Sequence, residues 1–316
     1  MSFSMSTMGR SFVGLIALCL YACVLMREVA SLVSYSAPGH WDNATDWHCS
    51  RFMCSNNFKT WKPDNPKFRW YDNNTACDAL ISKGINLITF YGDSYQRQLY
   101  AGLLITLNGD YKYGSLNANS QSPTCEYNRQ FFEKKCGVWQ LNHEGWVCNH
   151  KILLDPLLTG VENLNNCQGK KGTLGLWSFG NHKLGPNRYG VNNHTAYSQF
   201  FADSICPDVL DSKDSIDGSY KKPCSLWWVS THYRRVGYFV DEKEDVVKDY
   251  NLGMRRFFDS GKCGNINYID VYNMTSALVK ELPDHSESMT YDNVHWGMEV
   301  NLIKAQIVLN ALLEND

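Results

Sequence analysis

The sequence predicts an α/β fold in which a mainly parallel sheet is covered by helices on both faces. Short apolar runs have the length of buried strands, and helical patterns separate them along the chain. The candidate strands are residues 85–91, 174–179, 226–230 and 268–271. The candidate helices are residues 95–107, 242–258, 274–281 and 298–313. This alternation is typical of parallel sheets, because their crossover connections pack helices on the two faces.

The composition fits a globular protein with a substantial core. Of the 316 residues, 44% are hydrophobic and 20% are charged, which is too little charge for a disordered chain. Thirty Lys and Arg against 32 Asp and Glu leave a formal net charge of -2. Balanced charge supplies no basic field for nucleic acid, so we expect no nucleic-acid partner.

An apolar N-terminal segment indicates the compartment. Residues 11–26 carry no charge and follow a short tail at residues 1–10. Two interpretations remain for residues 11–33: a signal anchor that stays in the membrane, or a signal peptide cleaved near Ala30. Both place the rest of the chain in the secretory pathway. We expect a Golgi membrane protein with a lumenal catalytic domain or, if the segment is cleaved, a secreted protein.

The cysteine count agrees with an oxidising compartment. Two of the twelve cysteines lie in the apolar segment, and the other ten form an even set that allows up to five disulfides. The sequence has no C-x-x-C spacing and no histidine pair at i and i+4, so we expect no metal site. Four sequons would permit N-glycosylation, at Asn43, Asn73, Asn193 and Asn273.

A loop-rich lead-in precedes the predicted sheet. Residues 34–84 are rich in Trp, Asn, Asp and Cys and show little periodicity, which predicts a disulfide-tied segment without a core of its own. Residues 85–316 then form the catalytic domain. Within it, residues 108–171 hold four cysteines and few clear signals, and we interpret them as loops around the sheet.

A serine stands where the first predicted strand meets a helix. The strand leads into Gly92-Asp93-Ser94, and residues 95–107 continue as the helix. Such a turn exposes a serine hydroxyl above the sheet edge and aims the first N–H groups of the helix at a negative oxygen beside it. The alternative is that Asp93 or Ser94 only caps the helix. The Gly-x-Ser-x-Gly pattern of α/β-hydrolases is not met, because Gln96 replaces the second glycine.

A second motif precedes the last predicted helix. Asp292 and His295 are three residues apart, so one turn can hold both. In such a unit the carboxylate fixes the imidazole tautomer, and the other ring nitrogen takes the proton of a serine. The alternative is that Asp292 caps the helix and His295 is an ordinary surface residue.

Together the two motifs resemble those of the SGNH, or GDSL-type, hydrolase superfamily. They are similar to the motifs of its PC-esterase branch, which includes polysaccharide O-acetyltransferases and the lumenal domain of sialate O-acetyltransferase. The matching motifs are Gly92-Asp93-Ser94-x-x-Arg97 and Asp292-x-x-His295-Trp296, and the resemblance covers roughly residues 85–313. It implies a three-layer α/β/α sandwich in which Ser94 is the nucleophile, His295 the general base and Asp292 its orienting partner.

The resemblance also implies an oxyanion hole. Its donors would be the Ser94 N–H, a glycine N–H and the side chain of Asn181, which follows the strand candidate 174–179. A histidine stands after Asn181 where the family has an aspartate, so Asn181 is equally well explained as an ordinary turn residue. The glycine donor is left open among Gly109, Gly114 and Gly137.

Three further residues are candidates for substrate contact. Arg97 matches the branch motif, with a solvated helix residue as the alternative. His232 follows the strand candidate 226–230 at the rim where parallel sheets bind ligands, although a histidine there is often structural. Trp296, next to the proposed base, would stack on a sugar ring unless it is a core residue.

The resemblance implies a lumenal serine-dependent O-acyltransferase that moves an acetyl group onto a glycan or polysaccharide hydroxyl through an acyl-Ser94 intermediate. A carbohydrate esterase is the first alternative, and an inactive glycan-binding glycoprotein is the second. We expect no bound cofactor, with an acetyl ester or an acetyl group derived from acetyl-CoA as the donor. A separate membrane protein would deliver it, because a single apolar helix cannot carry a charged donor across a bilayer.

Overall fold

The computed structural model describes nine segments of the chain. They are residues 34–41, 61–132, 136–156, 172–178, 225–233, 245–262, 266–283, 290 and 294–314. The tail and the anchor or signal peptide predicted at residues 1–33 lie outside them. Within the described segments, no helix is long and apolar enough to cross a membrane.

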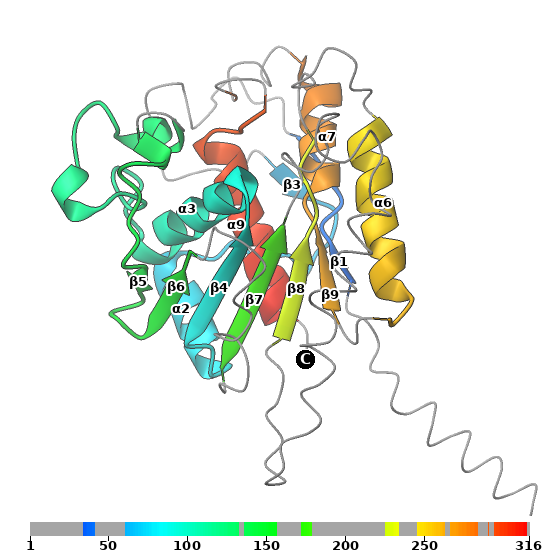
Figure 1. The fold of residues 1–316 in the computed structure, drawn as a ribbon, viewed down its shortest axis with the longest axis horizontal. Coiled ribbons are helices and arrows are strands. Elements are labelled where there is room, and N and C mark those ends of the chain that lie inside the picture. The colour runs from blue at the N-terminus through cyan, green and yellow to red at the C-terminus, as the bar shows by residue number, and fades with distance from the viewer. Residues whose placement is uncertain are drawn as a thin grey trace, which may run out of the picture. The chain divides into compact units, whose positions relative to one another are not determined.

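A seven-stranded sheet forms the centre of the fold (Figure 1). The strand order is β1-β9-β8-β7-β4-β6-β5, and all neighbouring pairs are parallel except β5 with β6. The strands span Ser34–Ser36 (β1), Leu87–Gly92 (β4), Trp146–Val147 (β5), Ile152–Asp155 (β6), Thr173–Ser178 (β7), Ser225–Val229 (β8) and Ile266–Asp270 (β9). A separate antiparallel pair is formed by β2 (Gly39–Trp41) and β3 (Trp61–Pro63).

Helices cover both faces of this sheet. They span Asn73–Ser82 (α2), Ser94–Asn108 (α3), Asp245–Asp259 (α6), Tyr272–Glu281 (α7) and Met298–Leu313 (α9). The crossovers β4-α3-β6 and β8-α6-β9 run in opposite directions along the sheet, so right-handed connections place α3 and α6 on opposite faces. Two neighbours in β8 agree with this, because Trp227 joins the core of α3 and α9 whereas Trp228 packs on Phe258 of α6. The predicted three-layer α/β/α sandwich is confirmed.

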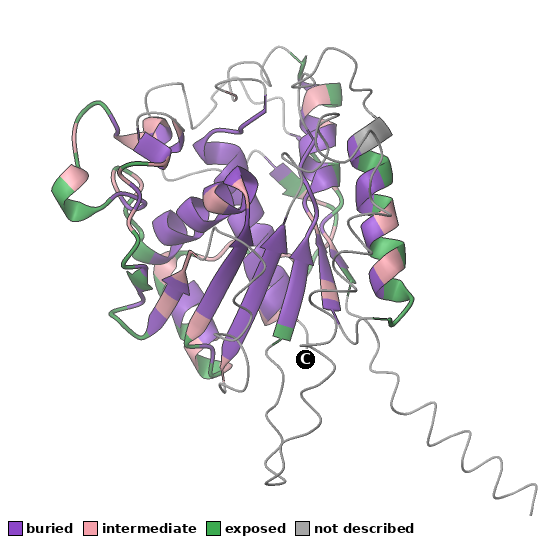
Figure 2. Ribbon diagram, in the orientation of Figure 1, coloured by how far each residue is buried: buried purple, intermediate pink, exposed green. Residues whose placement is uncertain are grey.

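The central strands are mainly apolar because both of their faces are covered. β7 is buried at every residue, and β4 and β8 are buried at every residue but the first (Figure 2). All four predicted strands and all four predicted helices are present, with ends that differ by a few residues.

The prediction that residues 108–171 only form loops is wrong. They contribute β5, β6 and two 3-10 helices, η1 (Ala118–Ser120) and η2 (Tyr127–Phe131). β6 has four residues that alternate between buried and half-buried, and such a short run gives no recognisable pattern in the sequence.

The lead-in is part of the same fold. β1 pairs with β9, and two amide side chains of α9 hold the segment before α2. Gln306 accepts from the N–H of Tyr71 and donates to its carbonyl, both at 2.8 Å. Asn310 does the same with Arg69, also at 2.8 Å. Residues 33–316 form one compact unit, to which the lead-in belongs.

Two disulfides are present among the described residues. Cys77 of α2 is bonded to Cys148, just after β5, and Cys125 is bonded to Cys136 in the loops that follow α3. The other six cysteines predicted to form disulfides lie outside the described residues. The prediction of disulfides is thereby confirmed for two pairs.

Candidate active site

Ser94 is the first residue of α3 and follows β4 after a single capping residue. Asp93 is that cap: its backbone is extended, and its side chain accepts from the N–H of Tyr95 at 3.0 Å. The cap starts the helix within one residue of the strand end. Asp93 is therefore the helix cap, one of the two residues for which the sequence suggested that role. Ser94 lies at the carboxyl edge of the sheet.

Gly92 allows β4 to run close to its neighbour β7. A Cβ atom at Gly92 would lie 2.1 Å from the carbonyl oxygen of Ser178, and the backbone φ is +157°. No side chain fits between these two backbones. The close contact brings the ends of β4 and β7 together directly before Ser94.

The turn lies where the strand order reverses. The chain passes from β4 to β6 on one side and then crosses back to β7 on the other side of β4. Open α/β sheets bind ligands outside the carboxyl ends of strands at such a switch point. Ser94 is therefore in the position where this architecture forms ligand sites.

His295 meets Ser94 although 201 residues separate them. The Nε2 atom of His295 lies 2.7 Å from the Ser94 Oγ. Ser94 is 6% exposed and His295 is 8% exposed, so this pair is nearly excluded from solvent. When Nε2 carries no hydrogen, the serine hydroxyl donates to it, which is the arrangement that removes the hydroxyl proton as the oxygen attacks.

Close packing of α3 against α9 brings the two residues together. Gly102 of α3 faces the backbone of Asn301 on α9, and a Cβ at Gly102 would lie 2.6 Å from the Asn301 carbonyl oxygen. Glycine thus lets the two helices approach more closely than any side chain would permit. Ser94 at the start of α3 and His295 just before α9 lie near the ends of these two helices.

A backbone bond and a side-chain bond hold the segment that carries His295. Met298 donates its N–H to Asn128 Oδ1 at 2.7 Å, which satisfies an open donor at the start of α9. The Trp296 indole donates to the Tyr233 carbonyl at 2.8 Å. These contacts come from η2 and from the loop after β8, so distant elements fix the position of His295.

The structure restricts the oxyanion donors. All three glycines considered use their N–H groups on backbone carbonyls: Gly109 on Ile105, Gly114 on Asp110 and Gly137 on Phe132, each at 2.9 Å. None of them supplies the missing donor, because a bonded N–H is not available to an oxyanion. Within the described residues, the N–H of Ser94 has no acceptor and remains a candidate. Asn181 lies outside the described residues.

Arg97 lies one helical turn after Ser94 and is half-buried. Burial lowers the pKa of Arg97, and the nearby Asp93 carboxylate acts in the opposite direction. Guanidinium remains charged at neutral pH even so. Arg97 therefore places a fixed positive charge on the same helix face as Ser94, which suits an anionic or polar ligand group.

His232 and Trp296 are not available as surface contacts. Trp296 is fully buried, so it is a core residue and has no open face for a sugar ring. His232 is 2% exposed, and its two ring nitrogens contact Val294 and Lys304 of the protein itself. The predicted substrate contacts of both residues are corrected, since their polar atoms and faces are already used inside the fold.

Several predicted residues lie elsewhere. Asp292 is outside the described residues, as are the sequon residues Asn43 and Asn193. Asn73 is half-buried at the start of α2. Asn273 is exposed, and its Nδ2 donates to Asp270 at 2.5 Å.

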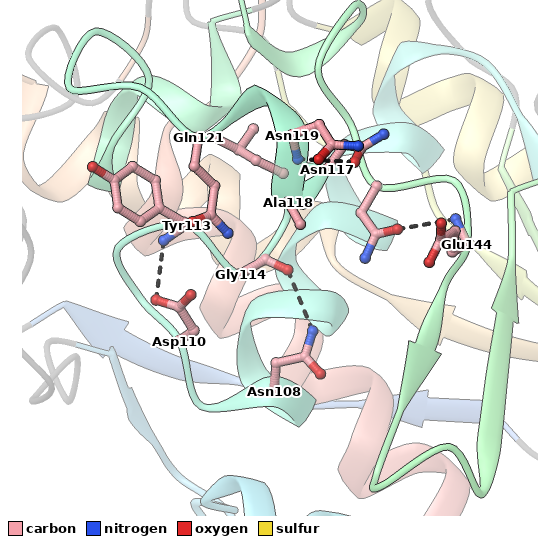
Figure 3. Close-up of a pocket in the computed structure, with 11 residues that line it drawn as sticks. Asn108, Asp110, Tyr113, Gly114, Asn117, Ala118, Asn119, Gln121 and Glu144 are labelled. Atoms are coloured by element: carbon pink, nitrogen blue, oxygen red, sulfur yellow. Dashed lines mark hydrogen bonds between the residues drawn. The ribbon is translucent and has the colours of Figure 1, made fainter.

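An open pocket of about 280 Å³ lies at the other end of α3 (Figure 3). Its walls are mainly polar and include Asn108, Asp110, Asn117 and Glu144. At about 1.5 Å per residue, the 15-residue helix α3 separates this pocket from Ser94 by roughly 20 Å. The pocket is therefore separate from the Ser94–His295 pair.

No family model and no curated protein matches this chain. Within the described residues, no group of three or more His, Cys, Asp or Glu side chains is arranged to hold a metal ion. The buried Lys304 of α9 lies near the site and was not predicted from the sequence.

One signal could have indicated it. Residues 302–309 are apolar except for Lys304 and Gln306, and a lysine in such a run is unusual.

Proposed function

We propose that this protein is a serine-dependent O-acyltransferase that passes an acetyl group through Ser94 to a hydroxyl of a glycan. The observation that supports it best is the 2.7 Å contact between Ser94 Oγ and His295 Nε2 at a strand-to-helix turn. A buried hydroxyl next to an imidazole nitrogen is the arrangement that nucleophilic catalysis requires.

The first half of the proposed reaction loads the serine. Ser94 Oγ attacks the carbonyl carbon of the donor ester while His295 Nε2 takes the hydroxyl proton. The N–H of Ser94 donates to the oxyanion that forms. The bond to the leaving alcohol then breaks as His295 returns the proton to that alcohol, and acetyl-Ser94 remains.

The second half transfers the acetyl group. A glycan hydroxyl gives its proton to His295 and attacks the acetyl carbon, and Ser94 recovers the proton as the ester to the glycan forms. Asp292 would orient the imidazole, and Asn181 would add an oxyanion donor. The glycan acceptor and the secretory location follow from the resemblance of the two motifs and from the apolar N-terminal segment.

A donor-acceptor assay tests this function. The full-length protein is incubated with 4-nitrophenyl acetate, with and without a panel of neutral and sialylated oligosaccharides. Absorbance follows the release of 4-nitrophenol, and mass spectrometry follows free acetate and acetylated sugar. We expect nitrophenol release that requires Ser94 and acetyl groups that appear on a glycan.

Ser260→Ala is the matched control, because Ser260 is an exposed serine at the end of α6. It should behave as the wild type. Full turnover by Ser94→Ala would refute the proposal, and free acetate with every glycan in the panel would show hydrolysis instead of transfer.

A further inference from the structure

A buried lysine lies behind the Ser94–His295 pair. Lys304 of α9 is 2% exposed and donates to His232 Nδ1 at 2.6 Å and to Asn301 Oδ1 at 3.1 Å. Within the described residues, no carboxylate pairs with Lys304. Burial lowers the pKa of Lys304 well below its ordinary value, because desolvation disfavours the charged form. Both partners of Lys304 also contact the segment that carries His295, His232 at the Val294 carbonyl and Asn301 at the Trp296 carbonyl.

The contacts of His232 select one form of its ring. The Nε2 atom lies 3.0 Å from the carbonyl oxygen of Val294, which can only accept, so Nε2 carries the hydrogen. In a neutral ring Nδ1 then carries a lone pair, which accepts from the Lys304 Nζ whether the lysine is an amine or an ammonium group. The two contacts together define the neutral Nε2–H tautomer of His232.

Neighbouring elements hold the ring in place. His232 stacks on Tyr95, the residue after Ser94, with ring centroids 3.7 Å apart. The preceding Thr231 donates its N–H to Asn251 of α6 and accepts from the Asn251 amide, both at 2.8 Å. The Tyr95 ring, the Thr231 backbone bonds and the Lys304 contact thus hold the imidazole against the Val294 carbonyl.

The second partner of Lys304 acts on the other side of His295. Because Asn301 Oδ1 accepts from Lys304, its Nδ2 is turned toward the Trp296 carbonyl, to which it donates at 2.7 Å. Hydrogen bonds thus connect Lys304 through His232 to Val294, the residue before His295. A second set connects Lys304 through Asn301 to Trp296, the residue after it.

We propose that Lys304 is a positioning residue for His295. By donating to His232 and Asn301 it holds both side chains in place, and they in turn fix the Val294 and Trp296 carbonyls on either side of His295. Its effect on turnover rests on the proposed function. Its hydrogen bond to the His232 Nδ1 does not, so the two can fail separately.

The tautomer is measured directly by long-range ¹H–¹⁵N NMR of the histidine rings in the full-length protein. The His232 signals are identified by their absence in His232→Gln. We expect the wild type to show a neutral ring protonated at Nε2, with the ¹⁵N resonance of a hydrogen-bonded lone pair at Nδ1. Lys304→Met should keep the Nε2–H and move the Nδ1 resonance to the position of a nitrogen without a hydrogen bond. A wild-type ring protonated at Nδ1 would overturn the proposal even if Lys304→Met fails to fold.

Turnover of 4-nitrophenyl acetate gives the second readout. Lys304→Met should lower kcat about 10-fold to 100-fold and change KM less than about twofold, because a displaced base slows the chemistry and not the binding of substrate. His232→Gln keeps a donor for the Val294 carbonyl and should retain more kcat than His232→Leu, which has none.

Lys248→Met is the matched control, since Lys248 is exposed on α6, and it should match the wild type. An unchanged kcat in folded Lys304→Met would overturn the positioning role. If Ser94→Ala retains full activity, the proposed function fails, while the tautomer measurement still decides the contact between Lys304 and His232.

Discussion

The two ends of α3 hold polar residues in opposite settings. At the N-terminal end, Ser94 is buried and its hydroxyl meets His295, which is 201 residues away. At the C-terminal end, exposed side chains bond to the backbone of close sequence neighbours, as Asp110 does with the N–H groups of Lys112 and Tyr113 at 2.9 and 3.0 Å. The first setting depends on the whole fold and shields a reactive group, whereas the second only shapes turns. A buried polar pair with a distant partner is thus a better sign of chemistry than a polar pocket.

The largest effect on activity is expected from substitutions at the N-terminal end of α3. Ser94→Ala and His295→Ala should each lower kcat/KM for 4-nitrophenyl acetate by about a thousandfold or more, and the double variant should lose little beyond either one, because the two side chains act as a unit. Asn108→Ala, at the opposite end of α3, should stay within about twofold of the wild type. Losses that multiply in the double variant would contradict a joint role.

The next largest effect is a loss of stability when the two disulfides near the C-terminal end of α3 are removed. Cys77–Cys148 closes a separation of 71 residues and Cys125–Cys136 one of 11. Replacing both cysteines of the first pair by alanine should reduce the free energy of unfolding by about 4 kcal/mol, and the same change in the second pair by about 3 kcal/mol, because longer loops lose more entropy on closure. Urea unfolding measures both. Equal activity per folded molecule is expected, and a larger loss for the shorter loop would contradict the prediction.

Two glycines that flank α3 allow a matched comparison. Gly92→Ala would place a methyl group 2.1 Å from the Ser178 carbonyl oxygen, so we expect a loss of about 3 kcal/mol of stability together with loss of activity. Gly109→Ala meets only the flexible Asn73 side chain, at 3.0 Å, and has a left-handed backbone at φ +69°. It should destabilise by about 1 kcal/mol and leave the activity per folded molecule unchanged. Similar behaviour of the two variants would show that the ends of α3 do not differ as described.

The smallest effect is a pH dependence at the cap of α2, the helix that packs beside the C-terminal end of α3. Asp72 accepts from the N–H and hydroxyl of Thr75 at 2.8 and 2.7 Å, and these bonds lower the pKa of Asp72 below its ordinary value of 3.8. The folded pKa is the lower one, so the contribution is present above the ordinary value and is lost as pH falls through the lowered one.

Asp72→Asn removes this titration. Its difference in unfolding free energy from the wild type should be constant near neutral pH and should change only below about pH 4. The change should be a fraction of a kcal/mol, because solvent screens this exposed carboxylate. A difference that changes between pH 5 and pH 7 would contradict the assignment to Asp72.

The features that the sequence predicted are those with contiguous signals. The buried strands β4, β7 and β8 are mainly apolar runs, and only Asp93 separates the end of β4 from the start of α3 at Ser94. His295 was proposed as a partner of Ser94 because it stands three residues after Asp292 and just before the last predicted helix, and the structure brings His295 and Ser94 into contact.

The features that the sequence did not predict depend on contacts between distant elements. A glycine in a helix such as Gly102 gives no sign that another backbone passes 2.6 Å from its missing Cβ. His232 stands at a strand end, which suggested a substrate contact, but Lys304 of the last helix occupies one of its nitrogens. Trp296 follows His295 in the motif, yet its indole lies in the core. Spacing along the sequence shows which residues are close in the chain. It does not show which side chains are buried by distant elements of the fold.

Covalent trapping tests the central claim, that His295 activates Ser94 as the nucleophile. The full-length protein is treated with a fluorophosphonate near neutral pH, and the modified residue is mapped by peptide mass spectrometry in the wild type, Ser94→Ala, His295→Ala and Ser260→Ala. We predict one adduct on Ser94 in the wild type and in Ser260→Ala, much slower labelling of His295→Ala and no adduct in Ser94→Ala. Labelling of Ser94→Ala at the wild-type rate, or an adduct confined to another residue, would contradict the claim.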